Sequence, residues 1–136
     1  MNPVTVSENS KTAVLYRFFN QFLPAYPFTS VPRNDDGVED VVFPYATYEV
    51  VTGSFDDGEL SITLNLWFYT TSEAIPDAKA QEISDYIGSG GMRLPCDGGY
   101  IWIKRGTPWC QNLSDDAAPG IKRRYINITV EYLTEN

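Results

Sequence analysis

The stretch Leu60-Ser-Ile-Thr-Leu-Asn-Leu-Trp-Phe-Tyr69 decides the fold class of this chain. Every second residue from Leu60 to Phe68 is large and apolar, and the residues between them are Ser, Thr, Asn, Trp and Tyr. A period of two is typical of a strand in an antiparallel sheet that packs one face on the core. The pattern predicts a strand over residues 60–69 whose other face meets solvent or a partner.

Further strands are predicted on both sides of this one. Tyr45 to Thr52 is rich in aromatic and β-branched residues, and the Gly- and Asp-rich segment 53–58 should join it to residues 60–69 as a hairpin. In the C-terminal third, the sequence predicts a hairpin of two short strands, then a polar loop and a long final strand. These three strands are expected over Met92–Cys96, Tyr100–Arg105 and Ile121–Leu133.

Two segments have helical periodicity. Lys11 to Leu23 carries one apolar stripe, with Ser10 as the expected N-cap and Pro24 as the end. Such an aromatic stripe packs in a core or docks a partner. The second helix is predicted from Ser72 to Ile87, with a capping box of Thr70 and Glu73, and glycines at 88–91 to end it. Its expected buried stripe is Ala80, Ile83 and Ile87.

The resulting order, α-β-β-α-β-β-β, predicts an α+β fold rather than a βαβ repeat. We expect a mostly antiparallel sheet of about five strands flanked by two helices. The length of 136 residues fits a single domain over residues 1–136. Residues 1–10 and 30–42 are expected to be flexible, because the segment from Pro24 to Pro44 holds four prolines and an acidic patch.

Charge and hydropathy exclude several classes of function. The formal net charge of −8 argues against nonspecific binding to nucleic acid or to an anionic membrane, since both rely on Lys and Arg. No apolar run approaches the ~18 residues of a membrane span. The N-terminal residues resemble no signal peptide, so we expect a soluble protein made inside the cell.

Catalytic chemistry is restricted because the chain has no histidine. Ser-His-Asp and Cys-His systems and most zinc hydrolases are thereby excluded. The adjacent acids Asp56, Asp57 and Glu59 are expected at a solvated hairpin tip, where carboxylates keep ordinary pKa values. Neither they nor the acidic residues near 34–40 follow the ligand ladder of a calcium loop. We therefore expect no enzyme, no cofactor and no metal; an enzyme that uses carboxylates alone would need an acid with a raised pKa in an apolar cleft.

The two cysteines, Cys96 and Cys110, are too few for a disulfide framework. One bridge between them is possible, because both flank the same predicted strand. In a bacterial cytoplasm two free thiols are favoured.

Basic residues are few, and five of the ten fall in two groups near the C-terminus, Lys104-Arg105 and Lys122-Arg123-Arg124. If the segments that carry them pair, a basic patch would face the acidic stretches at 35–40 or 56–59 of another copy, which suits head-to-tail association. Alternatively, these Lys and Arg residues protect strand edges from aggregation. Trp102 and Trp109 flank the first group, and Trp with Arg is typical of interface hot spots. The interface candidates are Trp102, Lys104, Arg105, Trp109, Lys122, Arg123, Arg124, Asp56 and Asp57.

The chain also resembles a known family over residues 12–134. The most specific segment is Cys96-Asp-Gly-Gly-Tyr-Ile-Trp-Ile-Lys-Arg-Gly106, and the order and spacing of the others add to it. These others are Pro24-Ala-Tyr26, Phe43-Pro-Tyr-Ala-Thr-Tyr-Glu49, Gly53-Ser-Phe-Asp-Asp-Gly58, Trp67, Lys79-Ala-Gln-Glu-Ile83, Pro108 and Val130-Glu-Tyr-Leu133. Together they resemble the minor capsid or tail-terminator proteins of siphophages and prophages of Gram-positive bacteria. The acidic stretch at 34–40 departs from the shorter loop of that family.

The resemblance implies a mixed sheet flanked by helices, and a hexameric ring at the head-proximal end of the tail tube. Such a ring would stop tube polymerisation and join the tail to the head. The implied partners are further copies of the chain, the major tail tube protein and the head–tail connector, with no nucleic acid or membrane. The implied location is the virion tail, assembled in the host cytoplasm. The alternative is a small prophage-encoded module that binds a host protein through exposed Tyr and Trp.

Overall fold

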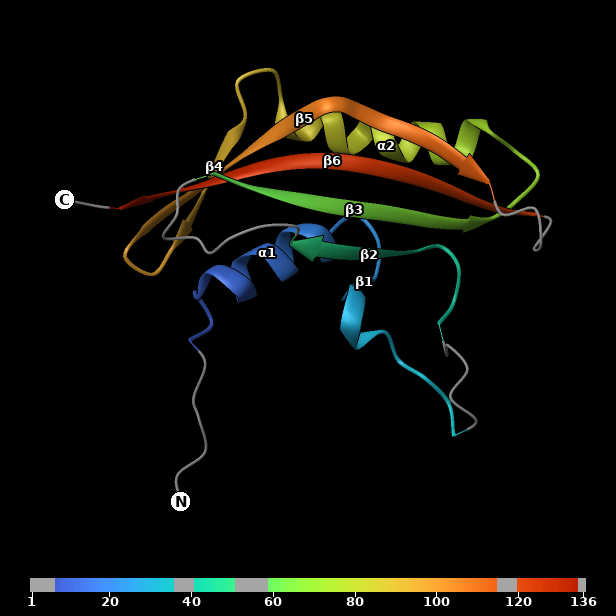
Figure 1. Ribbon diagram of the computed structural model, residues 1–136, viewed down its shortest axis with the longest axis horizontal. Helices are drawn as coiled ribbons and strands as arrows, with labels where there is room; N and C mark the ends of the chain where they lie inside the picture. Colours follow the sequence, from blue (N-terminus) through green and yellow to red (C-terminus); the bar gives the residue numbers. More distant parts are fainter. Residues whose placement is uncertain (1–6, 36–40, 51–58, 115–119, 135–136) are drawn as a thin grey trace.

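The computed structural model describes residues 7–35, 41–50, 59–114 and 120–134 (Figure 1). Within these residues the chain forms one six-stranded mixed sheet and two α-helices, so the predicted α+β class is confirmed. The elements are α1 (Lys11–Asn20), β1 (Ala25–Pro27), the short 3-10 helix η1 (Phe28–Ser30), β2 (Tyr45–Val50), β3 (Glu59–Tyr69), α2 (Ala74–Ile87), β4 (Met92–Cys96), β5 (Gly99–Ser114) and β6 (Ile121–Thr134).

The sheet has the order β1-β2-β3-β6-β5-β4. The predicted antiparallel pairs β2–β3 and β4–β5 are present, and β6 lies between β3 and β5, so that β3 and β6 are the two central strands. The expected mostly antiparallel sheet of about five strands differs in one detail: a sixth strand, β1, pairs with β2 in parallel. Three residues are too few to show a period, and a parallel partner leaves no hairpin signal in the sequence.

The first helix begins where the sequence predicts. The side-chain oxygen of Ser10 accepts a hydrogen bond from the backbone N–H of Ala13 at 3.2 Å, which satisfies one free donor of the first turn. The helix ends at Asn20, three residues before the predicted end at Leu23. Leu23 nevertheless stays buried, because the chain turns back toward the sheet at this point.

The second helix begins at Ala74, two residues after the predicted start, and the expected capping box is wrong. The hydroxyl oxygen of Thr70 accepts from the N–H of Ser72 at 3.0 Å. The Glu73 carboxylate accepts instead from Arg124 on β6. A tertiary ion pair therefore replaces the local cap at this helix start.

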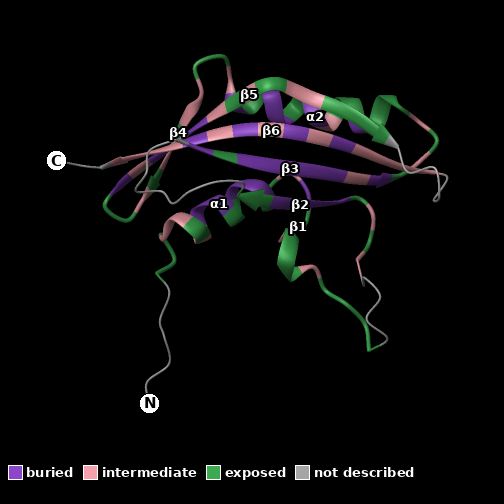
Figure 2. Cartoon of the chain, viewed as in Figure 1, coloured by how far each residue is buried: buried purple, intermediate pink, exposed green. Residues whose placement is uncertain are grey.

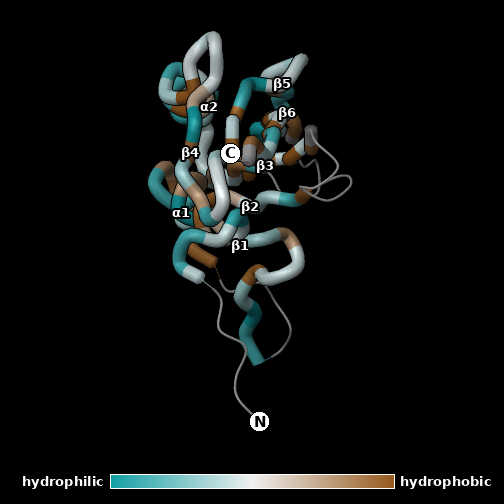
Figure 3. The backbone as a smooth tube through the Cα atoms, turned by 90° about the vertical axis from the view of Figure 1, so that its left-hand side faces the viewer, coloured by the Kyte–Doolittle hydropathy of each residue, from teal (hydrophilic) through white to brown (hydrophobic). Residues whose placement is uncertain are grey.

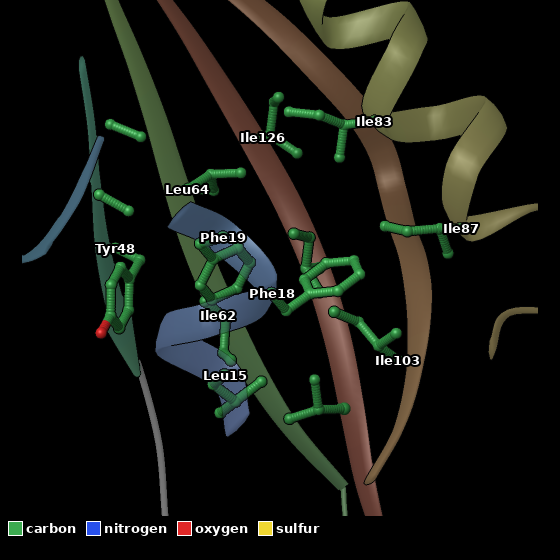
Figure 4. Close-up of a cluster of buried hydrophobic side chains, with 14 of the residues drawn as sticks. Leu15, Phe18, Phe19, Tyr48, Ile62, Leu64, Ile83, Ile87, Ile103 and Ile126 are labelled. Atoms are coloured by element: carbon green, nitrogen blue, oxygen red, sulfur yellow. The ribbon is translucent and has the colours of Figure 1, made fainter. Parts of the chain in front are cut away.

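Both helices pack on the same face of the sheet, as the turned view shows (Figure 3). They meet where Phe18 of α1 lies 6.0 Å from Tyr86 of α2, measured between ring centroids. The core between helices and sheet is aliphatic and aromatic (Figure 4). Its residues take alternate positions of β3 and β6. In β3 two polar residues of the other face, Thr63 and Asn65, are buried as well, so this strand is buried along most of its length (Figure 2). The core members from the helices and the two central strands are Val14, Leu15, Phe18, Phe19, Ala80, Ile83, Ile87, Leu60, Ile62, Leu64, Leu66, Phe68, Ile126, Ile128 and Val130.

β5 is longer than predicted. The expected strand ended at Arg105 and was followed by a polar loop, but the chain continues in the sheet to Ser114. A register shift between Arg105 and Cys110 takes up the extra residues as a bulge. The Gly and Pro residues of this stretch therefore mark an irregular strand instead of a loop.

Candidate functional site

Four of the predicted interface residues line one groove between β5 and α2. The groove has a volume of about 750 Å³ and is open to solvent. The tertiary structure thus brings both tryptophans and the first basic pair together on one wall. That wall carries Trp102, Lys104, Arg105 and Trp109, and the facing wall is formed by Gln81, Ser84, Ser89 and Gly90.

The bulge in β5 gives this groove its shape. A Cβ atom at Gly106 would lie 2.7 Å from the carbonyl oxygen of Asn127 on β6, so only glycine fits here without a shift. The side-chain amide of Asn127 donates to the carbonyl oxygen of Pro108 at 2.7 Å. The neighbouring strand therefore holds the bulge from both ends.

Arg105 connects the two walls. Its Nη1 donates to the hydroxyl oxygen of Ser84 at 2.9 Å, and Ser84 itself is buried at the helix face. Because serine is neutral, this bond orients the guanidinium and leaves its positive charge on the groove wall.

Trp102 is held in the same groove by a hydrogen bond to the facing wall. Its indole Nε1 donates to the carbonyl oxygen of Gly90 at 3.0 Å. The ammonium of Lys104 lies 4.8 Å from the centre of the Trp102 ring, a distance typical of a cation–π interaction. The cation and the indole thus form one unit on the groove wall.

Trp109 has a different environment. Its side chain is half-buried and packs against the core. Its Nε1 is shielded from solvent and has no hydrogen-bond partner among the described residues. An indole N–H in this state is a donor that lacks its acceptor, which costs free energy in the isolated chain.

The second basic group does not join this groove. β5 and β6 do pair, but the register places Lys104 opposite Thr129, so Arg124 lies five residues further along β6. The Arg124 side chain is only 1% exposed, and it donates to Asp77 at 2.9 Å and to Glu73 at 2.6 Å. Lys122 lies 2.7 Å from the other oxygen of Glu73. The two basic groups therefore do not form one patch, because the register separates them and because Glu73 and Asp77, at the start of α2, pair with Lys122 and Arg124 within the chain.

The ion pairs with Lys122 and Arg124 change the pKa of Glu73. Hydrogen bonds from Lys122 and then from Arg124 lower the pKa of Glu73 below its ordinary value. The carboxylate consequently stays charged to lower pH than a free glutamate side chain.

Arg123 lies on the opposite face of the sheet. Its guanidinium carbon is 5.2 Å from the centre of the Trp67 ring and 6.0 Å from that of Tyr125, and its Nε is buried without a hydrogen-bond partner. The three predicted cations of β6 are thus divided between the two faces by the alternation of the strand. A role of Lys122, Arg123 and Arg124 in an interface remains a prediction.

An aromatic surface on that opposite face was not singled out from the sequence. Trp67 stacks on Tyr45 with 6.2 Å between ring centroids, and its Nε1 donates to Thr47 at 3.0 Å. Phe28 and Phe43 join these residues in the lining of a cavity of about 290 Å³. The signal was present in the second face of the strand over residues 60–69, which was expected to meet solvent or a partner. Phe28, Val31, Arg33 and Phe43 lie beside part of that face.

The remaining candidates from the sequence are the two acids of the predicted hairpin tip and the two cysteines. Asp56 and Asp57 lie outside the described residues. Cys96 and Cys110 are free thiols, and burial raises the pKa of both.

In the described part of the chain, no group of three or more His, Cys, Asp or Glu side chains could hold a metal ion. No described helix is long and apolar enough to cross a membrane.

Comparison with known proteins gives a similar fold without a family. No protein-family model and no curated protein matches the chain. A solved structure whose name states no function is similar with a TM-score of 0.63 and 8% sequence identity, over 97% of this chain and 99% of that one. At this identity the likeness shows the fold alone.

Proposed function

We propose that this chain is a non-catalytic structural subunit of a long-tailed bacteriophage. In this proposal it forms a ring at the head-proximal end of the tail tube, stops tube polymerisation and joins the tail to the head connector. Its partners would be further copies of itself, the tail tube protein and the connector, in the virion tail. Assembly would take place in the bacterial cytoplasm.

One observation carries this proposal. The most specific segment of the family resemblance, Cys96 to Gly106, forms the end of β4, the turn and the first half of β5. The same segment supplies Trp102, Lys104 and Arg105 to the groove beside α2. The residues that suggest the family therefore coincide with the surface that has the composition of an interface.

The experiment is to delete the gene in the phage or prophage that encodes it and to measure tails by electron microscopy. We expect tails of irregular, excessive length that fail to join heads, and full-length protein supplied in trans should restore both. Normal tails joined to heads in the deletion strain, together with a monomeric purified protein that does not bind the tail tube, would contradict the proposal.

A second candidate is a small prophage-encoded module that binds a host protein. The aromatic surface favours it, since Phe28 is 56% exposed and Tyr69 is 70% exposed on the face away from the helices. Recovery of a stoichiometric host protein and no virion protein from infected lysate would support this candidate against the first.

A further inference from the structure

Two polar atoms are buried without a hydrogen-bond partner on the face of the sheet that α1 and α2 do not cover (Figure 3). They are the side-chain oxygen of Asn65 on β3 and Nε of Arg123 on β6. Asn65 is only 9% exposed, and the register places it directly between Thr47 of β2 and Tyr125 of β6. A buried polar atom without a hydrogen bond costs free energy, so a molecule from outside the chain that supplies the missing partner binds with that gain.

Arg123 is in contact with aromatic rings and not with acids. Among the described residues no carboxylate pairs with it, in contrast to its neighbours Lys122 and Arg124. Its guanidinium carbon lies 5.2 Å from the centre of the Trp67 ring and 6.0 Å from that of Tyr125. Such ring contacts attract the cation but supply no oxygen to its N–H groups. Arg123 therefore needs an acceptor, as Asn65 needs a donor.

An aromatic cavity adjoins these two side chains. Its volume of about 290 Å³ is below the roughly 300–1,000 Å³ of sites for drug-sized ligands, and it suits one large apolar side chain. The aromatic residues in its lining are Phe28, Phe43, Tyr45 and Trp67. Trp67 connects the cavity with the polar pair, because it lies opposite Arg123 in the register and shares a face of β3 with Asn65.

A peptide group supplies both missing partners. The oxygen of Asn65 requires an N–H donor and Nε of Arg123 requires an acceptor, and each peptide group carries one of each. An ionised carboxylate satisfies only the arginine, since it has no donor for the Asn65 oxygen. In an extended segment, a side chain beside this peptide group would enter the aromatic cavity.

We propose that this face binds an extended segment of another protein, with one peptide group between Asn65 and Arg123 and an aromatic side chain in the cavity. The described part of a second copy does not offer such a segment. Its exposed aromatic side chains all lie on helices or in the sheet: Tyr16, Phe28, Tyr69 and Tyr86. This inference does not depend on the tail function, and its test is carried out on the purified chain.

The probe is N-acetyl-L-phenylalaninamide, which combines an aromatic ring with two amide groups. It is titrated into the isotope-labelled full chain, and nuclear magnetic resonance follows the indole N–H of Trp67 and the side-chain amide of Asn65. We expect saturable shifts of both signals, with a dissociation constant of about 1 mM for a ligand of this size. N-acetylglycinamide, which lacks the ring, should bind at least about tenfold more weakly.

Variants on the two sides of the sheet test the polar pair. Asn65→Leu removes the acceptor and keeps a side chain of similar size, so probe binding at Trp67 should weaken at least about fivefold. Its urea midpoint should stay unchanged or rise, because an oxygen without a partner is replaced by an apolar group. Asn112→Leu makes the same change on the helix side, where Asn112 lies beside Glu73 and Asp77. This control should bind within about twofold of the unchanged protein.

Each outcome decides for or against the site. Unchanged signals with the aromatic probe, or equal binding by Asn65→Leu and Asn112→Leu, would overturn the proposal. So would a clear fall in the urea midpoint of Asn65→Leu, which would show that ordered water satisfies Asn65 as part of the fold. Shifts of Trp67 and Asn65 that depend on protein concentration without any probe would identify a second copy as the occupant and contradict a segment of another protein.

Discussion

Two arginines from neighbouring strands contact α2 and its start: Arg124 of β6 and Arg105 of β5. They differ in burial and in the charge of their partners. At the start of the helix, the buried guanidinium of Arg124 meets two carboxylates. Further along the helix, the exposed Arg105 meets only the neutral hydroxyl of Ser84. The first arrangement compensates the charge inside the chain, and the second leaves a charge on a groove. The partners on the helix, rather than the residue type, decide whether a strand arginine is structural or available to bind.

The largest expected effect comes from removing the buried member of this pair. Arg124→Ala should lower the free energy of unfolding by about 3 kcal/mol, since it empties a buried site and leaves two carboxylates facing it. Arg105→Ala should cost less than about 1 kcal/mol, because it removes one hydrogen bond at an exposed position. Urea denaturation followed by circular dichroism measures both. Equal losses in the free energy of unfolding would contradict the difference between the two arginines.

The groove itself depends on backbone contact, which a glycine substitution can test. Gly106→Ala should cost about 2 kcal/mol, because the new methyl group meets the backbone of β6 at the bulge. Gly90→Ala is the matched control on the other wall: nothing lies within 4 Å of a Cβ there. It should stay within about 0.5 kcal/mol of the unchanged protein. A neutral Gly106→Ala would show that the bulge can shift away from β6.

The hydrogen bond between Arg105 and Ser84 should contribute less to the free energy of unfolding. Ser84→Ala removes the acceptor of Arg105 and should cost about 1 kcal/mol in the free energy of unfolding. Ser89→Ala, at an exposed position of the same wall, serves as the control and should leave thermal stability unchanged. A large loss for Ser84→Ala would place Arg105 among the structural arginines and contradict the contrast drawn with Arg124.

The smallest expected effect is a change in pH dependence at the ion cluster. Because the folded state lowers the pKa of Glu73, its ion pairs stabilise the protein above the ordinary carboxyl pKa. This contribution is lost as the pH falls through the lowered value. Glu73→Gln should therefore be less stable than the unchanged protein at about pH 7, and the difference should shrink toward about pH 3. Urea midpoints across this range measure it, with Glu82→Gln as the control for net charge; a constant difference would contradict the linkage.

Local patterns predicted the elements well and their ends less well. The start of α1 at Ser10 and the alternation of β3 were readable, because caps and periods depend on near neighbours in the sequence. The end of β5 was not, since the Gly-Thr-Pro stretch has the composition of a loop and stays in the sheet only because β6 holds it. β1 was missed because its pairing with β2 is parallel and brief.

The candidate site divides in the same way. Trp102, Lys104, Arg105 and Trp109 could be selected from the sequence because they lie within eight residues of one another. Arg124 was grouped with them by charge, and the structure separates it from them. Its two carboxylate partners lie 47 and 51 residues away along the chain, a distance at which sequence pattern carries no pairing information.

The sequence by itself determined the α+β class, the two helices, five of the six described strands and the lack of histidine chemistry, because these depend on composition and on short-range periodicity. The tertiary structure alone decided that Lys122 and Arg124 pair with carboxylates at the start of α2, that β5 extends beyond the end of its pairing with β4, and that four side chains share a groove. Those features arise from the long-range placement of β6 between β3 and β5 and from the packing of α2 across them, which bring together residues that the chain keeps far apart.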